Sequence, residues 1–307
     1  MLTFSKSIVR QVVPVAAVLA LSAFNVAADD TAQKRFARPE DAVRELIAAA
    51  RDDDESALIA ILGPGSDDVV SSGDPVQDRT ARERVVKAAN EGTRIETLAS
   101  GAAIARLGQD DWPLPIPLVK DGDQWRFDTA AGREEVVNRR IGRNELKAIA
   151  VAHVYVEAQQ EHAKREGGYA RKLHSDPGTH SGLYWEDPTG KQPSPLGPLL
   201  AEASAEGYAA RDPGAAPQPY HGYFFRILTE QGAHAPGGAR SYVKDGRMTG
   251  GFALVAYPAE RGASGVMTFI VGPQGIVYQK DLDAKTSEIG KSMTSFDPDD
   301  SWIPVRD

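Results

Sequence analysis

The sequence predicts an α+β protein in which short helices and a small meandering sheet precede a long helix packed on an antiparallel sheet. Apolar residues recur at helical spacing near the N-terminus, and short runs rich in aromatic and β-branched residues fill the C-terminal part. The longest uninterrupted helical stretch lies between these regions. We expect an N-terminal domain over residues 29–135 and a C-terminal domain over residues 136–307.

Residues 1–28 have the parts of a cleavable secretory signal peptide. Lys6 and Arg10 precede an apolar run over Val12–Phe24, and small residues follow up to Ala28. The run is short for a membrane span and Pro14 interrupts it, so we expect cleavage after Ala28 rather than anchoring. The predicted mature chain is periplasmic or secreted and has no membrane span.

Composition excludes several classes of function. Removal of Lys6 and Arg10 would change the formal net charge from -8 to -10, and a surface of this sign repels nucleic acid and anionic lipid. The chain has no cysteine, which excludes disulfides, thiolate metal sites, cysteine catalysis and a lipid-modified N-terminal cysteine. A chain of this length can bury enough apolar surface to fold without disulfides.

The predicted N-terminal domain starts with helices. Apolar residues recur at helical spacing over Arg38–Leu62, the acidic run Asp52–Glu55 interrupts them, and a third helix is predicted over Arg79–Asn90. Strand-like runs follow at Arg94–Leu98, Ala102–Leu107, Ile116–Val119 and Gln124–Phe127. The last two would form a hairpin with Asp121 and Gly122 in its turn. At the level of fold alone, this order resembles nuclear-transport-factor-2-like domains.

The predicted C-terminal domain opens with a long helix over Asn144–Glu166. Residues 167–219 are rich in Pro and Gly, and we expect an ordered loop with a short helix over Leu199–Glu206. Strands are predicted at Tyr223–Thr229, Phe252–Tyr257, Gly265–Val271 and Ile276–Lys280. The third of these is apolar on both faces, so we expect the long helix to cover one of them. This arrangement resembles pilin-like domains, although the helix is internal and a pilin's N-terminal stalk is missing.

Several motifs occur in order along the chain: Trp112–Leu118, Arg139–Glu145, Gly182–Glu186, Ser194–Pro198, Tyr220–Leu228 and Gly265–Val271. Together they resemble the bacterial exported family catalogued as domain of unknown function 2950. The resemblance covers nearly the whole predicted mature chain. It implies a secreted or periplasmic protein and brings no established activity, cofactor or catalytic residue with it.

The Pro- and Gly-rich loop carries the densest set of candidate binding residues: His174, Asp176, His180, Tyr184, Trp185, Glu186 and the adjoining Asp187. Their imidazoles and carboxylates are of the kind that divide acid and base roles or ligate a divalent metal. The spacing of His174 and His180 matches no metal motif, so neither a metal nor a cofactor is expected. Tyr184 and Trp185 are interpreted as an anchor for the loop, or alternatively as a platform for a sugar or peptide.

Tyr220 and His221 are further candidates because they precede the first strong strand of the C-terminal sheet. His221 could act with a serine such as Ser264, although no serine lies in a G-x-S-x-G elbow. Structural hydrogen bonding is the simpler interpretation. His153 and Glu157 lie one helical turn apart, and we expect a hydrogen bond between them.

No catalytic signature is found, so the leading hypothesis is a non-enzymatic periplasmic protein that binds an envelope protein or a cell-wall component. The first alternative is a cell-envelope hydrolase that uses the loop His174–Asp187. The second is a pilin-like structural or assembly subunit. The binding and hydrolase hypotheses differ in whether the loop histidines and His221 should converge in one pocket.

Overall fold

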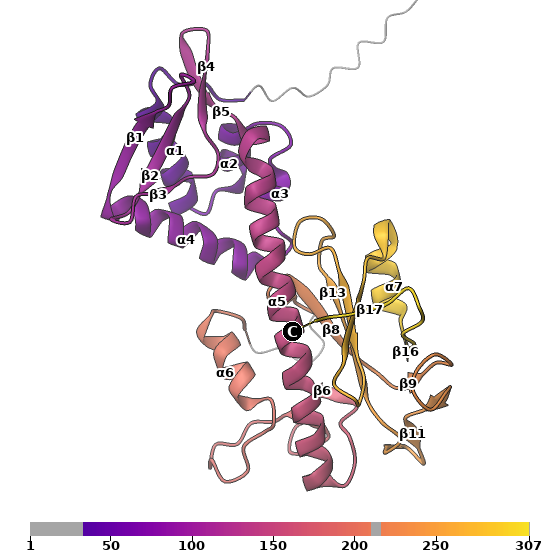
Figure 1. Cartoon of the computed structure of the whole chain (residues 1–307). Helices are drawn as coiled ribbons and strands as arrows, with labels where there is room; N and C mark the ends of the chain where they lie inside the picture. Colours follow the sequence, from indigo (N-terminus) through magenta and orange to yellow (C-terminus); the bar gives the residue numbers. More distant parts are fainter. Residues whose placement is uncertain (1–32, 210–215, 307) are drawn as a thin grey trace, which may run out of the picture. The chain divides into compact units, whose positions relative to one another are not determined.

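The computed structural model describes residues 33–209 and 216–306 and shows an α+β fold (Figure 1). The predicted fold class is confirmed, since helices, a small sheet, a long helix and an antiparallel sheet follow one another along the chain. The predicted signal peptide lies outside the described residues. Over the two described ranges, none of the helices has both the length and the hydropathy of a membrane span.

The N-terminal helices are α1 Pro39–Arg51, α2 Glu55–Leu62, α3 Asp67–Val70 and α4 Pro75–Glu91. Asp54 and Asp74 cap α2 and α4, and each carboxylate accepts a hydrogen bond from the backbone N–H three residues further on. The acidic run that was predicted to interrupt the first helix therefore also starts the second. Because Asp74 and Pro75 form a favourable helix start, α4 begins at Pro75 rather than at Arg79.

The first sheet is antiparallel and has the strand order β1-β2-β4-β5, with β3 paired to β2. Its strands are β1 Thr93–Thr97, β2 Ala103–Leu107, β3 Trp112–Pro113, β4 Leu118–Asp121 and β5 Gln124–Phe127. The predicted hairpin is present, with Asp121 paired to Gln124 and Gly122 in a left-handed conformation. Helices α1 and α2 pack on β5, and the first hydrophobic core includes Ile61, Leu118 and Phe127.

The long helix α5 spans Thr129–Glu166 and starts well before the predicted Asn144. Its first half was missed because it is highly charged and contains Gly132 and Gly142, which are poor helix formers. Gly132 permits a close approach, since a Cβ there would lie 2.5 Å from the Pro115 carbonyl oxygen. The predicted domain boundary between residues 135 and 136 falls inside this helix, which packs side chains against both hydrophobic cores.

The second sheet is antiparallel, in the order β17-β15-β14-β13-β8. Its strands are β8 Tyr223–Leu228, β13 Ala253–Pro258, β14 Thr268–Val271, β15 Val277–Lys280 and β17 Ile303–Pro304. Every residue of β13 and β14 is buried, so both faces of the sheet are covered, as expected. Helix α5 packs against β13, β14 and β15 (Figure 1), and the Tyr155 hydroxyl donates to the Ala253 carbonyl at 2.9 Å.

The remaining elements are short. They are β6 Lys172–His174, β7 Gly182–Tyr184, α6 Gly197–Ala205, β9 Glu230–Gln231, β10 Arg240–Ser241, β11 Val243–Lys244, β12 Arg247–Met248, η1 Asp283–Lys285, α7 Thr286–Ser292 and β16 Ser295–Phe296. The short helix predicted in the Pro- and Gly-rich loop is α6. The parallel pairing of β6 with β7 was not predicted.

Two side chains of the second sheet should contribute very differently to the free energy of unfolding, because one is buried and the other is exposed. Phe269 is 1% exposed, so Phe269→Ala should lower the free energy of unfolding by about 3–5 kcal/mol. Ile303 is 62% exposed, so the control Ile303→Ala should change it by no more than about 0.5 kcal/mol. Urea denaturation measures both. Equal, small losses would contradict the burial of Phe269.

Candidate functional site

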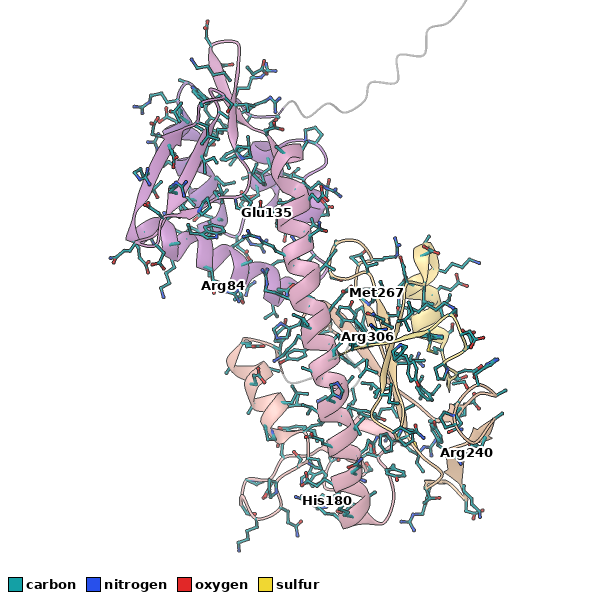
Figure 2. All side chains as sticks on the ribbon, in the orientation of Figure 1. Arg84, Glu135, His180, Arg240, Met267 and Arg306 are labelled. Atoms are coloured by element: carbon teal, nitrogen blue, oxygen red, sulfur yellow. The ribbon has the colours of Figure 1, made fainter. Side chains whose placement is uncertain are left out.

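The Pro- and Gly-rich loop is held in place by its own aromatic and charged side chains. Trp185 is 8% exposed, and its indole N–H donates to the Gln192 carbonyl at 2.8 Å. His180, labelled in Figure 2, stacks on Trp185 with ring centroids 4.1 Å apart. The His180 Nδ1 also lies 3.0 Å from a carboxylate oxygen of Glu166. The Trp185 ring therefore packs the loop against the protein, and His180 covers it where a ligand would have to stack.

The two aspartates of the loop have local partners. The Lys172 ammonium donates to Asp176 at 2.7 Å and lowers the pKa of that carboxyl. The Thr189 hydroxyl donates to Asp187 at 2.6 Å and is the main cause of the lowered pKa of Asp187. Both carboxylates thus stabilise turns, and their lowered pKa values keep them ionised rather than available as acids at neutral pH.

The other candidates of the loop, His174, Tyr184 and Glu186, differ in their surroundings. The rings of His174 and Tyr184 meet edge to face at 5.6 Å and are half-buried, whereas Glu186 is exposed. Within residues 33–209 and 216–306, no three or more His, Asp or Glu residues are grouped so as to hold a metal ion. The loop therefore gathers aromatic contacts and turns rather than a convergent set of acids and bases.

A second group of side chains combines two predicted residues with one that was not predicted. Tyr208, which follows α6, meets Tyr220 and His221, which precede β8. The ring centroids lie 4.9 Å apart for Tyr208 and Tyr220, and 4.4 Å apart for Tyr220 and His221. All three residues are half-buried, so part of each remains in contact with solvent. We call these three residues the tyrosine–histidine cluster.

The backbone of His221 is held in a left-handed conformation, with φ of 48°. Its N–H donates to the Tyr208 hydroxyl at 3.1 Å, and its Nε2 lies 2.8 Å from a Glu206 carboxylate oxygen. The next N–H, of Gly222, donates to Asp74 at 2.8 Å, and the Tyr208 hydroxyl donates to the same carboxylate oxygen at 2.9 Å. These bonds maintain a conformation that costs a non-glycine residue about 1–2 kcal/mol, and such strain often accompanies functional sites.

The Tyr220 hydroxyl is the least well-bonded polar group of the cluster. It is buried and makes no hydrogen bond of good geometry with the described residues, although the Glu206 carboxylate lies close enough to accept weakly from it. Burial, followed by the charges of Glu206 and Glu202 and by a weak hydrogen bond to Glu206, raises the pKa of Tyr220, so the hydroxyl keeps its proton and can donate. The Lys147 ammonium lies 5.7 Å from the centre of the Tyr220 ring and donates to Glu202 at 2.6 Å. The cluster therefore combines aromatic surface, a weakly bonded hydroxyl and charges of both signs.

Among the described residues, Ser264 has the structural role that the sequence favoured, and the bond expected between His153 and Glu157 is not formed. Ser264 is buried, and its hydroxyl donates to the Glu260 carbonyl at 3.1 Å and accepts from the Glu260 N–H at 3.0 Å. It closes a turn and is not bonded to His221. His153 is half-buried and Glu157 is exposed, and in the described part of the chain no hydrogen bond joins them. That expectation was wrong, because one-turn spacing brings two side chains near each other without fixing their rotamers.

Tyr220 and His221 can be identified as candidates from the sequence, but the residues that position them cannot. Glu206 and Tyr208 lie 15 and 13 residues before His221, across a Pro- and Gly-rich stretch, and Asp74 lies 148 residues before Gly222. The one available signal was the Asp-Pro pair at the start of α4, which is typical of a helix cap. A cap gives no indication that the same carboxylate also accepts a tyrosine hydroxyl and a distant N–H.

Fold and site together define an α+β protein with a long internal helix on an antiparallel sheet and a half-exposed tyrosine–histidine cluster. A family model described as Protein of unknown function (DUF2950) matches residues 33–305, and the chain belongs to this family. The resemblance inferred from the motifs is thereby confirmed. No curated protein and no solved structure matches the chain. The pilin-like and nuclear-transport-factor-2-like analogies stay predictions.

The bonds around Asp74 predict that one hydroxyl contributes to stability. Tyr208→Phe removes both the donor to Asp74 and the acceptor for the His221 N–H, so the free energy of unfolding should fall by about 1–2 kcal/mol. The control Tyr278→Phe removes a half-buried tyrosine hydroxyl with no hydrogen bond in the described part of the chain and should change it by no more than about 0.5 kcal/mol. Urea denaturation distinguishes the two variants. Indistinguishable curves would show that the Tyr208 bonds contribute nothing.

Proposed function

We propose that the chain is exported and binds a cell-wall component outside the cytoplasm, through the tyrosine–histidine cluster. The observation that carries this proposal is the buried Tyr220 hydroxyl, which lies beside half-exposed rings and makes no hydrogen bond of good geometry among the described residues, with only the Glu206 carboxylate near it. Buried polar groups are nearly always well paired, so a weakly bonded donor in such a place suits a ligand that supplies a better acceptor. Binding sites combine aromatic surface with a few placed polar groups in this way.

The ligand class follows from the chemistry of the cluster. Aromatic rings stack on the apolar faces of sugars and on peptide groups, while the carboxylates of Glu202 and Glu206 can accept from hydroxyl or amide groups. Cell-wall polymers offer sugars and short peptides in one molecule. We therefore favour a cell-wall component over an envelope protein as the partner.

Contacts within the loop support binding over the predicted hydrolase. General acid–base hydrolysis needs groups that converge on one substrate position. Asp176 and Asp187 are bonded within turns, and His180 is stacked on Trp185. Hydrolysis in the loop would require Asp176, Asp187 or His180 to leave these contacts, whereas binding at the tyrosine–histidine cluster leaves them unchanged. The assembly-subunit hypothesis stays a prediction, since no observation favours it.

Binding at the cluster can be tested with His221→Gly. Glycine adopts positive φ without strain, so this variant should keep the local backbone while losing the imidazole. We expect its apparent affinity for purified cell-wall sacculi, measured by cosedimentation, to fall at least about tenfold, or ~1.4 kcal/mol. Asp245→Gly is a matched control, because Asp245 also has φ of 48° but lies at the tip of the β11–β12 hairpin. Equal binding by both variants would remove the cluster from the proposal.

Export can be tested separately from binding. Expressed in a bacterium with its own leader, the chain should be found outside the cytoplasm with Asp29 as its first residue, as read by mass spectrometry of fractionated cells. Ala28→Arg places a large charged residue at the cleavage position and should leave the precursor uncut. An uncut wild-type chain in the cytoplasmic fraction would refute the export proposal.

A further inference from the structure

A surface cleft with a volume of about 510 Å³ opens beside the first half of α5 and shares no residue with the tyrosine–histidine cluster. Helix α3, which packs against α5 (Figure 1), and the loop after it form one wall, and the turn that follows β13 forms the other. The volume lies within the range of sites for small ligands. The lining includes charged side chains of both signs: Asp67, Asp68, Arg133, Glu260 and Arg261.

A buried arginine of α5 connects the two walls of the cleft. Arg140 is 7% exposed, and its guanidinium donates to the carbonyls of Asp68 and Val69 at 2.8 and 3.0 Å. The same group donates to the Ala263 carbonyl, in the opposite wall, at 3.5 Å. Because one planar group bonds to both walls, the cleft is formed before a ligand arrives, and binding need not include the cost of ordering it.

Two arginines line the cleft with part of each guanidinium unused. Arg133 donates to Asp68 through Nε and Nη2. Arg261 donates to Asp281 through the same two nitrogens. In the described residues neither Nη1 group, which carries two N–H donors, forms a hydrogen bond, and the two arginine side chains are 49% and 36% exposed. Each arginine is therefore held in place by one carboxylate and keeps donors for a second.

Two carboxylates that line the cleft have no counter-charge. Asp67 and Glu260 are exposed, and within residues 33–209 and 216–306 neither carboxylate takes part in a hydrogen bond or ion pair. A Cβ built on Gly73 would lie 2.8 Å from the Glu260 Cγ, so the Glu260 side chain reaches the loop that follows the helix of Asp67. Since the two arginines of the cleft bind other carboxylates, Asp67 and Glu260 remain available to a cationic group.

We propose that this cleft binds a short peptide with free termini. Asp67 and Glu260 accept from its ammonium group, and the Nη1 groups of Arg133 and Arg261 donate to its carboxylate. A ligand with both charges meets acceptors and donors in one cleft without breaking an existing ion pair. The cleft has room for more than one amino-acid residue, which favours a peptide over a single amino acid. A divalent metal fits less well, because no three described carboxylates are grouped so as to hold one.

The first arm of the test concerns the ammonium group. Isothermal titration calorimetry of the full chain at low ionic strength compares trialanine with its N-acetylated, C-amidated and doubly capped forms. Trialanine should bind at least about tenfold more tightly than the doubly capped form. In Asp67→Asn/Glu260→Gln that gain should shrink, and trialanine should bind no better than its N-acetylated form. Asp110→Asn/Glu157→Gln, which removes the same charge from exposed positions outside the cleft, should behave as the wild type does.

The second arm concerns the carboxylate. Arg133→Gln should weaken binding of N-acetylated trialanine, which has a carboxylate and no ammonium, and should leave the difference between trialanine and its N-acetylated form in place. Arg35→Gln is the matched control, because Arg35 is also exposed and paired with one carboxylate, that of Asp121 at 2.8 Å, but lies outside the cleft. Thermal melting should confirm that each variant folds.

Three results would overturn the proposal: no binding of trialanine to the wild type, equal affinities for all forms of the peptide, or equal weakening by the cleft variants and their controls. The proposal does not rest on the function proposed for the tyrosine–histidine cluster. Sacculus binding by His221→Gly and by the cleft variants is measured in parallel, so either proposal can fail while the other stands.

Discussion

The polar side chains in the middle of α5 are the contacts on which both parts of the fold depend. Arg140 is 7% exposed, Asn144 is buried, and Glu145 accepts from two backbone N–H groups. Their partners lie in segments that belong to either core: Asp68, Val69, Gln77, Ser264, Val266 and Met267. Burial lowers the pKa of Arg140, and the backbone carbonyls that accept from it supply the hydrogen bonds that its charge loses on leaving water. Loss of Arg140 or Asn144 would leave partners unsatisfied in segments of both parts of the fold.

The tyrosine–histidine cluster is held by Asp74. That carboxylate caps α4, accepts from the Tyr208 hydroxyl and accepts from the Gly222 N–H. The left-handed backbone of His221 is therefore held by the start of a helix from the N-terminal part of the chain. A site supported in this way is ordered before a ligand arrives, so binding need not include the entropy cost of ordering it.

The sequence predicted elements whose signal is local and missed those decided by distant contacts. The hairpin at Gly122 and the second half of α5 follow from turn chemistry and apolar spacing. The first half of α5 does not, because its helical state depends on packing that Gly132 permits against Pro115. Likewise, residue type alone identified Tyr220 and His221 as candidates. The carboxylates that orient them could not be found, since no pattern in a single sequence records a contact across 148 residues.

What the protein can bind follows from which polar groups its own structure leaves without partners. On α5, the inward side chains of the motif Arg139–Glu145 are hydrogen-bonded, whereas Arg143 is exposed and forms no ion pair with the described residues. One turn further on, Lys147 is neutralised by Glu202 and lies over the ring of Tyr220. The same helix thus carries an unpaired arginine and, one turn further on, a lysine that is neutralised and packed over an aromatic ring. Salt screens the charge of the arginine and hardly affects packing on the aromatic ring. The salt dependence of binding should therefore separate the contributions of these two groups to the affinity for any ligand that contacts both.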